Sequence, residues 1–149
     1  DTPLAVYNYP CNKFVAGFIG SPQMNFLNAK VEKNGDNYAL AFGEYRIPVQ
    51  KPELEAYVGK EVILGIRPED IHAEESFLSI SEASNIEANV DLAEMMGSEI
   101  YLYLNCCGQK MVARVPSRTG IRADDMVKLA LDVNKIHVFD AETENVICH

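Results

Sequence analysis

The sequence has no long hydrophobic run. Its longest uninterrupted apolar stretch is the seven residues from Phe14 to Gly20, whereas a helix that spans a bilayer needs about 18–20. We also find no secretory signal peptide, and we therefore expect no direct membrane insertion. Because 48% of the 149 residues are apolar, the chain can bury a core, and we expect a soluble globular protein.

Basic residues are scarce. The chain has 13 Lys and Arg residues against 22 Asp and Glu, which gives a formal net charge of -9, and the basic residues are scattered. Nucleic-acid affinity comes largely from clustered Lys and Arg that release counterions from phosphates. The composition therefore argues against a nucleic-acid partner and is typical of a solvated cytosolic surface.

Motifs for nucleotide or nucleophilic chemistry are missing. A phosphate-binding loop needs G-x-x-x-x-G-K-S/T, and the only Gly-Lys pair, Gly59-Lys60, continues with Glu61. No Ser-His-Asp or Cys-His arrangement has a supporting motif, and the acidic pairs Glu74-Glu75 and Asp124-Asp125 are typical of solvated charge. We predict no catalytic residue and no bound cofactor in this chain.

The four cysteines lack the C-x-x-C spacing of a metal site; they are Cys11, Cys106, Cys107 and Cys148. We expect no metal site and interpret them as free thiols in a reducing cytosol. The adjacent pair should point to opposite faces if it lies at a strand end. Of the histidines, we interpret His72 and His137 as structural residues of strands, and we assign no role to His149.

The residues from Phe14 to Phe26, FVAGFIGSPQMNF, mark a boundary between helix and strand. The apolar residues of its first part recur at helical spacing, Asn12 can cap the start, and Gly20-Ser21-Pro22 ends the helix. The whole segment 1–21 reads as two helical pieces interrupted at Pro10. We therefore predict a domain boundary near residue 21.

Alternation of apolar and polar residues begins at Phe26 and predicts short β-strands with a hairpin at Asn34-Gly35. Strands at this spacing indicate a sandwich or barrel. After the first strand, the predicted strands lie near Tyr38–Phe42, Tyr45–Val49, Val62–Ile66, Ile86–Leu92, Ile100–Leu104, Met111–Val115, Val127–Leu131 and Ile136–Phe139, with a helical turn after Pro52.

Three blocks of sequence recur in the same order, which predicts an internal duplication. The motif of residues 29–32 resembles that of 88–91, and residues 46–48 resemble 114–116. The third block, 62–66 followed by 71–72, recurs at a constant offset of 65. We expect two halves, at about 22–80 and 86–149, with a seam near 74–85.

Four segments resemble one protein family: FVAGFIGSPQMNF, LGIRPEDI (64–71), EMMGSE (94–99) and IHVFDAET (136–143). The chain resembles the C-terminal regulatory domain, a transport-associated OB (TOBE) domain, of ATP-binding subunits of maltose-type bacterial carbohydrate ABC importers. The resemblance implies a mainly β fold of duplicated OB-like or MOP-like small barrels that share strands. A short N-terminal helical segment, residues 1–21, would remain from the ATPase domain, and 22–149 would form the regulatory domain.

The resemblance implies a mechanical role. Two copies would stay in contact through their β regions as a homodimer, while the attached ATPase domains open and close like tweezers and act on permease subunits. ATP and Mg would bind in the ATPase domain, which is missing here, since the chain also lacks the Gly-Gly pair of the ABC signature. A first residue of Asp1 rather than Met suggests an excised piece. The expected location is cytoplasmic, at the inner face of the membrane; the sugar remains undetermined.

Four residues are candidate contacts under this resemblance. Lys13 and Phe26 lie near the junction that can receive a regulatory protein, although the corner could also be packing alone. Arg67 and Glu69 lie in a turn that could face the ATPase domain or the second subunit, and their charges could instead cap or pair locally.

Two other functions remain open. Related barrels of molybdate systems hold an oxyanion, and Ser117-Arg118-Thr119-Gly120 is the only compact loop here that offers suitable donors, although a polar turn is the far commoner meaning of such a loop. An OB-type nucleic-acid binder would need aromatic residues among basic ones. Tyr101 and Tyr103 share a strand face, but Glu99 and Asn105 flank them, and cross-strand packing is a simpler explanation.

Overall fold

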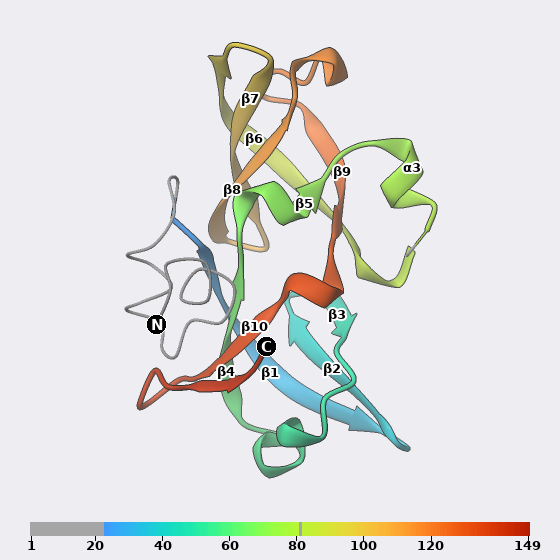
Figure 1. Ribbon diagram of the computed structural model, residues 1–149, viewed down its shortest axis with the longest axis vertical. Coiled ribbons are helices and arrows are strands. Elements are labelled where there is room, and N and C mark those ends of the chain that lie inside the picture. The colour runs from blue at the N-terminus through green and yellow to red at the C-terminus, as the bar shows by residue number, and fades with distance from the viewer. Residues whose placement is uncertain (1–22, 81) are drawn as a thin grey trace, which may run out of the picture.

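The computed structural model describes residues 23–80 and 82–149, and within these residues the chain is mainly β (Figure 1). The predicted fold class is thereby confirmed, while the helical segment predicted for residues 1–21 lies outside the described residues. The strands are β1 (Asn25–Asn34), β2 (Asn37–Phe42), β3 (Tyr45–Pro48), β4 (Glu61–Ile66), β5 (Ile71–His72), β6 (Asn85–Met96), β7 (Glu99–Cys106), β8 (Gln109–Pro116), β9 (Met126–Leu131), β10 (His137–Asp140) and β11 (Val146–Cys148).

Short helical turns connect the strands, and none of the described helices has the length and apolar content to cross a membrane. One of them, α3, lies in the seam that the sequence predicted near residues 74–85. The turns are η1 (Pro52–Tyr57), η2 (Pro68–Asp70), α3 (Glu75–Leu78), η3 (Glu82–Ser84), η4 (Ser117–Thr119) and η5 (Val133–Lys135).

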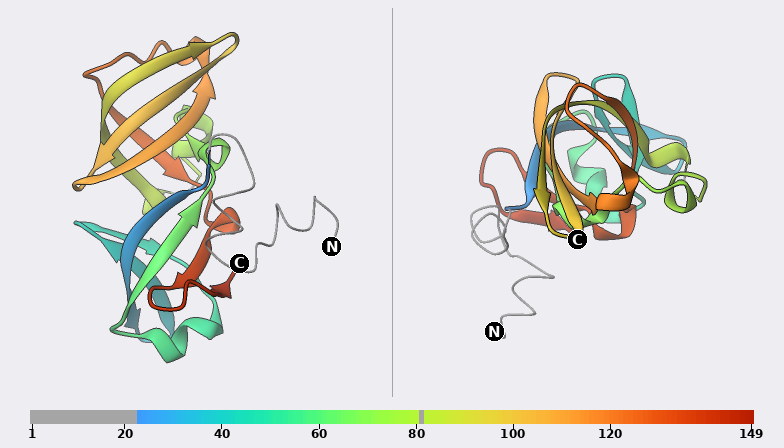
Figure 2. Two further views of the ribbon diagram at one scale, coloured as in Figure 1. Left: turned by 90° about the vertical axis from the view of Figure 1, so that its left-hand side faces the viewer. Right: turned by 90° about the horizontal axis from the view of Figure 1, so that it is seen from above.

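The strands form two antiparallel sheets. The first has the order β11-β10-β4-β1-β2-β3 and the second β5-β9-β6-β7-β8. The two sheets follow one another along the long axis of the molecule (Figure 2). The predicted hairpin joins β1 to β2, but its two turn residues are Gly35 and Asp36, one position later than the Asn-Gly pair indicates, because Asn34 pairs with Asn37.

The predicted duplication is confirmed by the strand pairing. The order β10-β4-β1-β2-β3 matches β5-β9-β6-β7-β8 strand for strand. His137 lies opposite Gly65, and His72 lies opposite Ala130, so both members of the pair repeat at the offset of 65 that the sequence predicts. The terminal β11, which we did not predict, extends the first sheet only.

Each sheet is completed by a strand from the other half of the sequence. The early strand β5 pairs with β9, and the late strand β10 pairs with β4. The two connections meet where the backbone N–H of Asp132 donates to the carbonyl oxygen of Asp70 at 3.0 Å. Neither sheet can therefore form in full from one contiguous stretch, and we expect the two sheets to unfold together.

The hydrophobic core reflects this exchange of strands between the two halves. One large apolar cluster includes buried residues of both sheets, and a smaller cluster of Met24, Ile63 and Phe139 covers the other face of β4. The strand is consequently buried on both faces from Val62 to Ile66. A Cβ atom at Gly65 would lie 2.7 Å from Met24 Sδ and 2.8 Å from Phe139 Cε2, so only glycine fits there without displacement of the cluster.

Candidate functional site

The motif that opens the β region joins the two sheets. Residues Asn25 to Ala29 of β1 pair with β4, and the pairing with β2 begins only at Lys30. On this open edge, the Asn25 side chain donates from Nδ2 to the carbonyl oxygen of Val112 at 2.8 Å and accepts from the Val112 N–H at 2.6 Å. Asn25 is buried. Its amide therefore replaces a strand partner for β8.

Gln109 makes a second clamp of the same kind from the other side. Its Oε1 accepts from the Asn28 backbone N–H at 2.7 Å, and its Nε2 donates to the Asn28 carbonyl oxygen at 3.0 Å. Two primary amides thus tie β1 to β8, although no backbone ladder links the two strands. Neither clamp was predicted, because the sequence around an Asn or Gln in a strand does not indicate which backbone its side chain will bind.

Phe26 lies at one wall of a groove beside these clamps. The groove has a volume of about 620 Å³ and is lined by Gln23, Phe26, Tyr103, Lys110 and Val112 among others. The Phe26 ring also packs edge-on against Phe139, with 6.0 Å between ring centroids. Phe26, one of the predicted contacts, is therefore half-buried and serves both the core and the groove.

The groove opens onto the outer face of the second sheet. Leu92, Tyr103 and Val112 lie opposite one another on three adjacent strands, and we call them the Tyr103 row. Leu92 is 53% exposed, and Tyr103 and Val112 are half-buried. On β7 and β8 the alternation explains this face, because the strand neighbours of Tyr103 and Val112 are buried; they are Leu102, Leu104, Met111 and Ala113.

Charges of both signs border the Tyr103 row. On one side, Lys110 Nζ pairs with Asp91 Oδ2 at 2.8 Å, and on the other, Arg114 Nε lies 3.4 Å from Glu99 Oε2. The Tyr103 hydroxyl donates to Glu94 Oε1 at 3.2 Å. Desolvation, together with this carboxylate, raises the pKa of Tyr103, so the phenol stays neutral. The face is apolar at its centre and polar at its rim, which carries charges of both signs.

The other predicted contacts lie elsewhere. Arg67 is 3% exposed, and burial lowers the pKa of its guanidinium, an effect that the nearby Asp70 carboxylate opposes. Glu69 is half-buried in η2. The fourth residue, Lys13, lies outside the described residues. Of the three candidate contacts within the described residues, only Phe26 lines the groove. The turn with Arg67 and Glu69, which we call the charged corner, lies where the two sheets exchange strands.

Two titratable groups near this exchange have opposite shifts. Burial raises the pKa of Asp70 to about 6, with Glu69 and Asp132 adding to the effect. Burial lowers the pKa of His137 to about 4, and its Nδ1 lies 2.8 Å from Nδ1 of His149. One nitrogen must donate and the other accept at this distance, so the two rings cannot both be imidazolium cations. The sequence predicted a structural His137 but not its partner.

These shifts predict opposite dependences of stability on pH between about 4 and 6. In this window folded Asp70 holds a proton that the unfolded chain has released, so its ionisation lowers the free energy of unfolding as the pH rises. The unfolded chain instead binds a proton at His137 that the folded chain excludes, so this term raises the free energy of unfolding with pH. The two terms offset each other in the unmodified chain.

We therefore expect single substitutions to reveal separately how Asp70 and His137 contribute to the pH dependence of stability. Relative to the unmodified chain, Asp70→Asn should gain stability as the pH rises through the window, whereas His137→Gln should lose it. Urea unfolding at a series of pH values, followed by circular dichroism, measures both difference curves. Two flat curves would show that neither group senses folding in this range.

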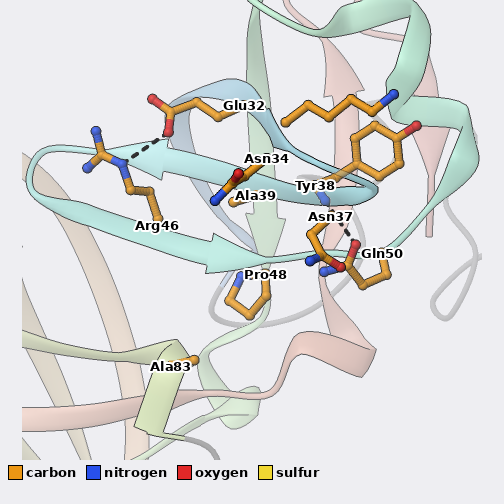
Figure 3. Close-up of a pocket in the computed structure, with 10 residues that line it drawn as sticks. Glu32, Asn34, Asn37, Tyr38, Ala39, Arg46, Pro48, Gln50 and Ala83 are labelled. Atoms are coloured by element: carbon orange, nitrogen blue, oxygen red, sulfur yellow. Dashed lines mark hydrogen bonds and ion pairs between the residues drawn. The ribbon is translucent and has the colours of Figure 1, made fainter.

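A second groove runs over the outer side of β1 to β3 (Figure 3). It has a volume of about 580 Å³, and most of the residues that line it are polar or charged. Arg46 Nε pairs with Glu32 Oε1 at 3.0 Å, and the Tyr38 backbone N–H donates to Gln50 Oε1 at 2.9 Å. Because the Arg46 and Glu32 charges neutralise each other and Gln50 already accepts a hydrogen bond, the groove offers little charge to a ligand. We assign it no function.

The loop considered for an oxyanion has its donors engaged. Arg118 pairs with Glu74, and Thr119 Oγ1 donates to the carbonyl oxygen of Pro116 at 2.9 Å. The N–H groups of Ser117 and Gly120 donate to backbone carbonyl oxygens at 2.8 and 3.2 Å. An anion there would have to displace a carboxylate. Within residues 23–80 and 82–149, no three His, Cys, Asp or Glu side chains cluster as metal ligands.

The sequence matches two family descriptions that together cover residues 20–139. One is the MalK OB fold domain over residues 20–71, and the other is the TOBE domain over residues 64–139, just over half of the chain. A transport-associated OB architecture, with two small barrels in succession, is thus the class that the fold and these matches define. The chain belongs to the TOBE domain family.

Curated relatives include two import ATP-binding proteins. The chain is 44% identical over 147 residues to the oligosaccharides import ATP-binding protein MsmX of Bacillus subtilis, covering 96% of this chain and 40% of that protein. It is 39% identical over 152 residues to the trehalose/maltose import ATP-binding protein MalK of Thermococcus litoralis, with 98% and 40% covered. The chain therefore spans about two-fifths of the length of these relatives and corresponds to their OB and TOBE part.

A solved structure shares the fold alone. The cytoplasmic molybdate-binding protein ModG, with molybdate bound, aligns with a TM-score of 0.58 and covers 76% of this chain and 94% of ModG. The two sequences are only 12% identical. The likeness supports the architecture of paired small barrels and carries no argument about a ligand.

Proposed function

We propose that the chain is the regulatory and dimerisation domain of the ATP-binding subunit of a bacterial carbohydrate ABC importer. The family match and the names of the relatives, which import oligosaccharides or trehalose and maltose, support this assignment. Two copies would hold the paired ATPase domains together at the cytoplasmic face of the membrane. ATP and Mg would bind in those ATPase domains, and the permease would be reached through them.

The observation that carries the dimer proposal is the Tyr103 row with its rim of both charges. The chain has a net charge of -9, so two copies repel one another unless the contact is locally balanced. A two-fold contact presents the same patch on both copies, and the patch must therefore complement itself. Asp91, Glu94 and Glu99 beside Lys110 and Arg114 supply the charges of both signs that a self-complementary contact needs, while Leu92 supplies exposed apolar area at the centre.

Substitution of Leu92 by Asp should separate the dimer. A charge buried at the centre of an interface costs about 2 kcal/mol or more, which weakens association at least 30-fold. Ile80→Asp is the matched control, because Ile80 is 80% exposed and lies in the connection after α3. Size-exclusion chromatography with light scattering should give the monomer mass for Leu92→Asp and the dimer mass for Ile80→Asp. Equal masses for both variants would count against this surface.

We propose that regulatory proteins dock in the groove that Phe26 lines, in competition with the dimer contact, since Tyr103 and Val112 line the same groove. Lys13, the other candidate contact, lies outside the described residues. The half-exposed Phe26 ring in a groove of about 620 Å³ supports this assignment.

At the charged corner, Glu69 is the better residue for a charge reversal than Arg67, because Arg67 is buried and its reversal would disturb folding itself.

A further inference from the structure

The turn between β7 and β8 carries two adjacent cysteines. Cys106 ends β7, and Cys107 with Gly108 forms the two-residue loop, since Cys106 pairs with Gln109. Both loop residues have positive φ, 53° at Cys107 and 82° at Gly108. Such a turn normally takes Asn or Asp followed by Gly. A cysteine at this position is conformationally unfavourable, and nothing in the turn itself requires a thiol.

The two thiols lie side by side but in different surroundings. Cys106 Sγ is 3.9 Å from Cys107 Sγ. Cys106 is 1% exposed and its thiol donates to the Glu87 carbonyl oxygen at 3.5 Å, whereas Cys107 is exposed. Cys107 also rests against the β2–β3 turn, where a Cβ atom at Gly43 would lie 2.3 Å from its sulfur. The backbone of a second hairpin therefore holds the exposed thiol beside the buried one.

We propose that Cys106 and Cys107 form a peroxide-sensitive dithiol, a site of reversible oxidation to a disulfide between adjacent residues. The Cys107 thiolate attacks one oxygen of hydrogen peroxide, which gives a sulfenic acid and releases hydroxide. Cys106 sulfur then attacks Cys107 sulfur, the S–O bond breaks, and the hydroxide leaves with the Cys106 proton as water. Two thiols and one peroxide give one disulfide and two waters, and sulfur is oxidised while peroxide is reduced.

The geometry sets the order of these steps and their reversibility. Burial raises the pKa of the Cys106 thiol to about 12, so it keeps its proton until the second step, and the exposed Cys107 reacts first. Adjacent Cα atoms are about 3.8 Å apart, less than the roughly 4.4–6.8 Å of ordinary disulfides. A bond across this pair is strained and exposed, and such disulfides are readily reduced. The inference is independent of the proposed transport role.

The test is to treat the Cys11→Ser chain with hydrogen peroxide and measure its intact mass and free thiols. We expect the loss of two hydrogens and of two of the three thiols, with a peptide map that places both changes on Cys106 and Cys107 and leaves Cys148 free. Dithiothreitol should restore both thiols. The control is Cys107→Asn in the same Cys11→Ser chain, since Asn suits the turn and this variant should fold. Peroxide should change neither its mass nor its thiol count.

Three results would overturn the proposal. They are a gain of oxygen atoms at Cys107 with Cys106 still free, a disulfide to Cys148 or between chains, and an unchanged mass in peroxide.

Discussion

Phe139→Ala should lower the free energy of unfolding by about 4 kcal/mol, near the upper end for a single substitution in a core. Phe139 is fully buried and belongs to the exchanged strand β10. It packs on Met24 and Ile63, and its ring meets Phe26 edge-on. The substitution therefore leaves a cavity where the opening motif, β4 and the exchanged strand meet.

Urea unfolding measures this loss, and circular dichroism is the suitable signal because the chain has no Trp. Phe77→Ala is the matched control: the ring is 39% exposed and stacks on His72 at 3.8 Å, so we expect a loss of about 1 kcal/mol or less. Both variants should unfold in one transition, since the strand exchange couples the two sheets. Similar losses for the two variants would contradict the role given to the Phe139 cluster.

Asn25→Leu should cost about 2–4 kcal/mol, because it leaves the N–H and the carbonyl of Val112 without their amide partner in a buried place. Leucine has a similar volume, so the loss reports the two hydrogen bonds rather than a cavity. The same unfolding experiment gives the value. The outcome bears directly on the motif FVAGFIGSPQMNF, because Asn25 is its last residue but one.

Gln109→Leu provides the comparison. Gln109 also makes two hydrogen bonds to a backbone, at Asn28, but it is less buried than Asn25. Water can replace its partners, so we expect a loss of about 1 kcal/mol. If Asn25→Leu is as mild as Gln109→Leu, the first clamp is not what holds β1 to β8.

Most of the fold was predictable because its signals are local. Alternation along Leu27, Ala29 and Val31 gave the face of β1, and the recurrence of residues 62–66 at 127–131 gave the duplication that the strand pairing confirms. The family resemblance also followed from short contiguous motifs. The shift of the first hairpin by one residue shows the usual limit, since turn residues and register depend on the partner strand.

The resemblance implied that the two halves share strands, but the particular contacts that join them could not be predicted, because they depend on which segments meet in space. Nothing in Ile71-His72 indicates that β5 completes the sheet of the other half. The burial of Arg67 and the pairing of His137 with His149 arise at the same exchange. The amide of Asn25 finds Val112 across 87 positions of sequence. Each of these is a long-range contact between residues whose types are common on surfaces.

The central claim, that this domain holds two subunits together, is tested most directly by the mass of the unmodified chain in solution. Sedimentation equilibrium over a wide range of concentrations measures it. Our account predicts a reversible rise to twice the chain mass of 16.6 kDa. A mass that stays at 16.6 kDa even at the highest concentrations would contradict it.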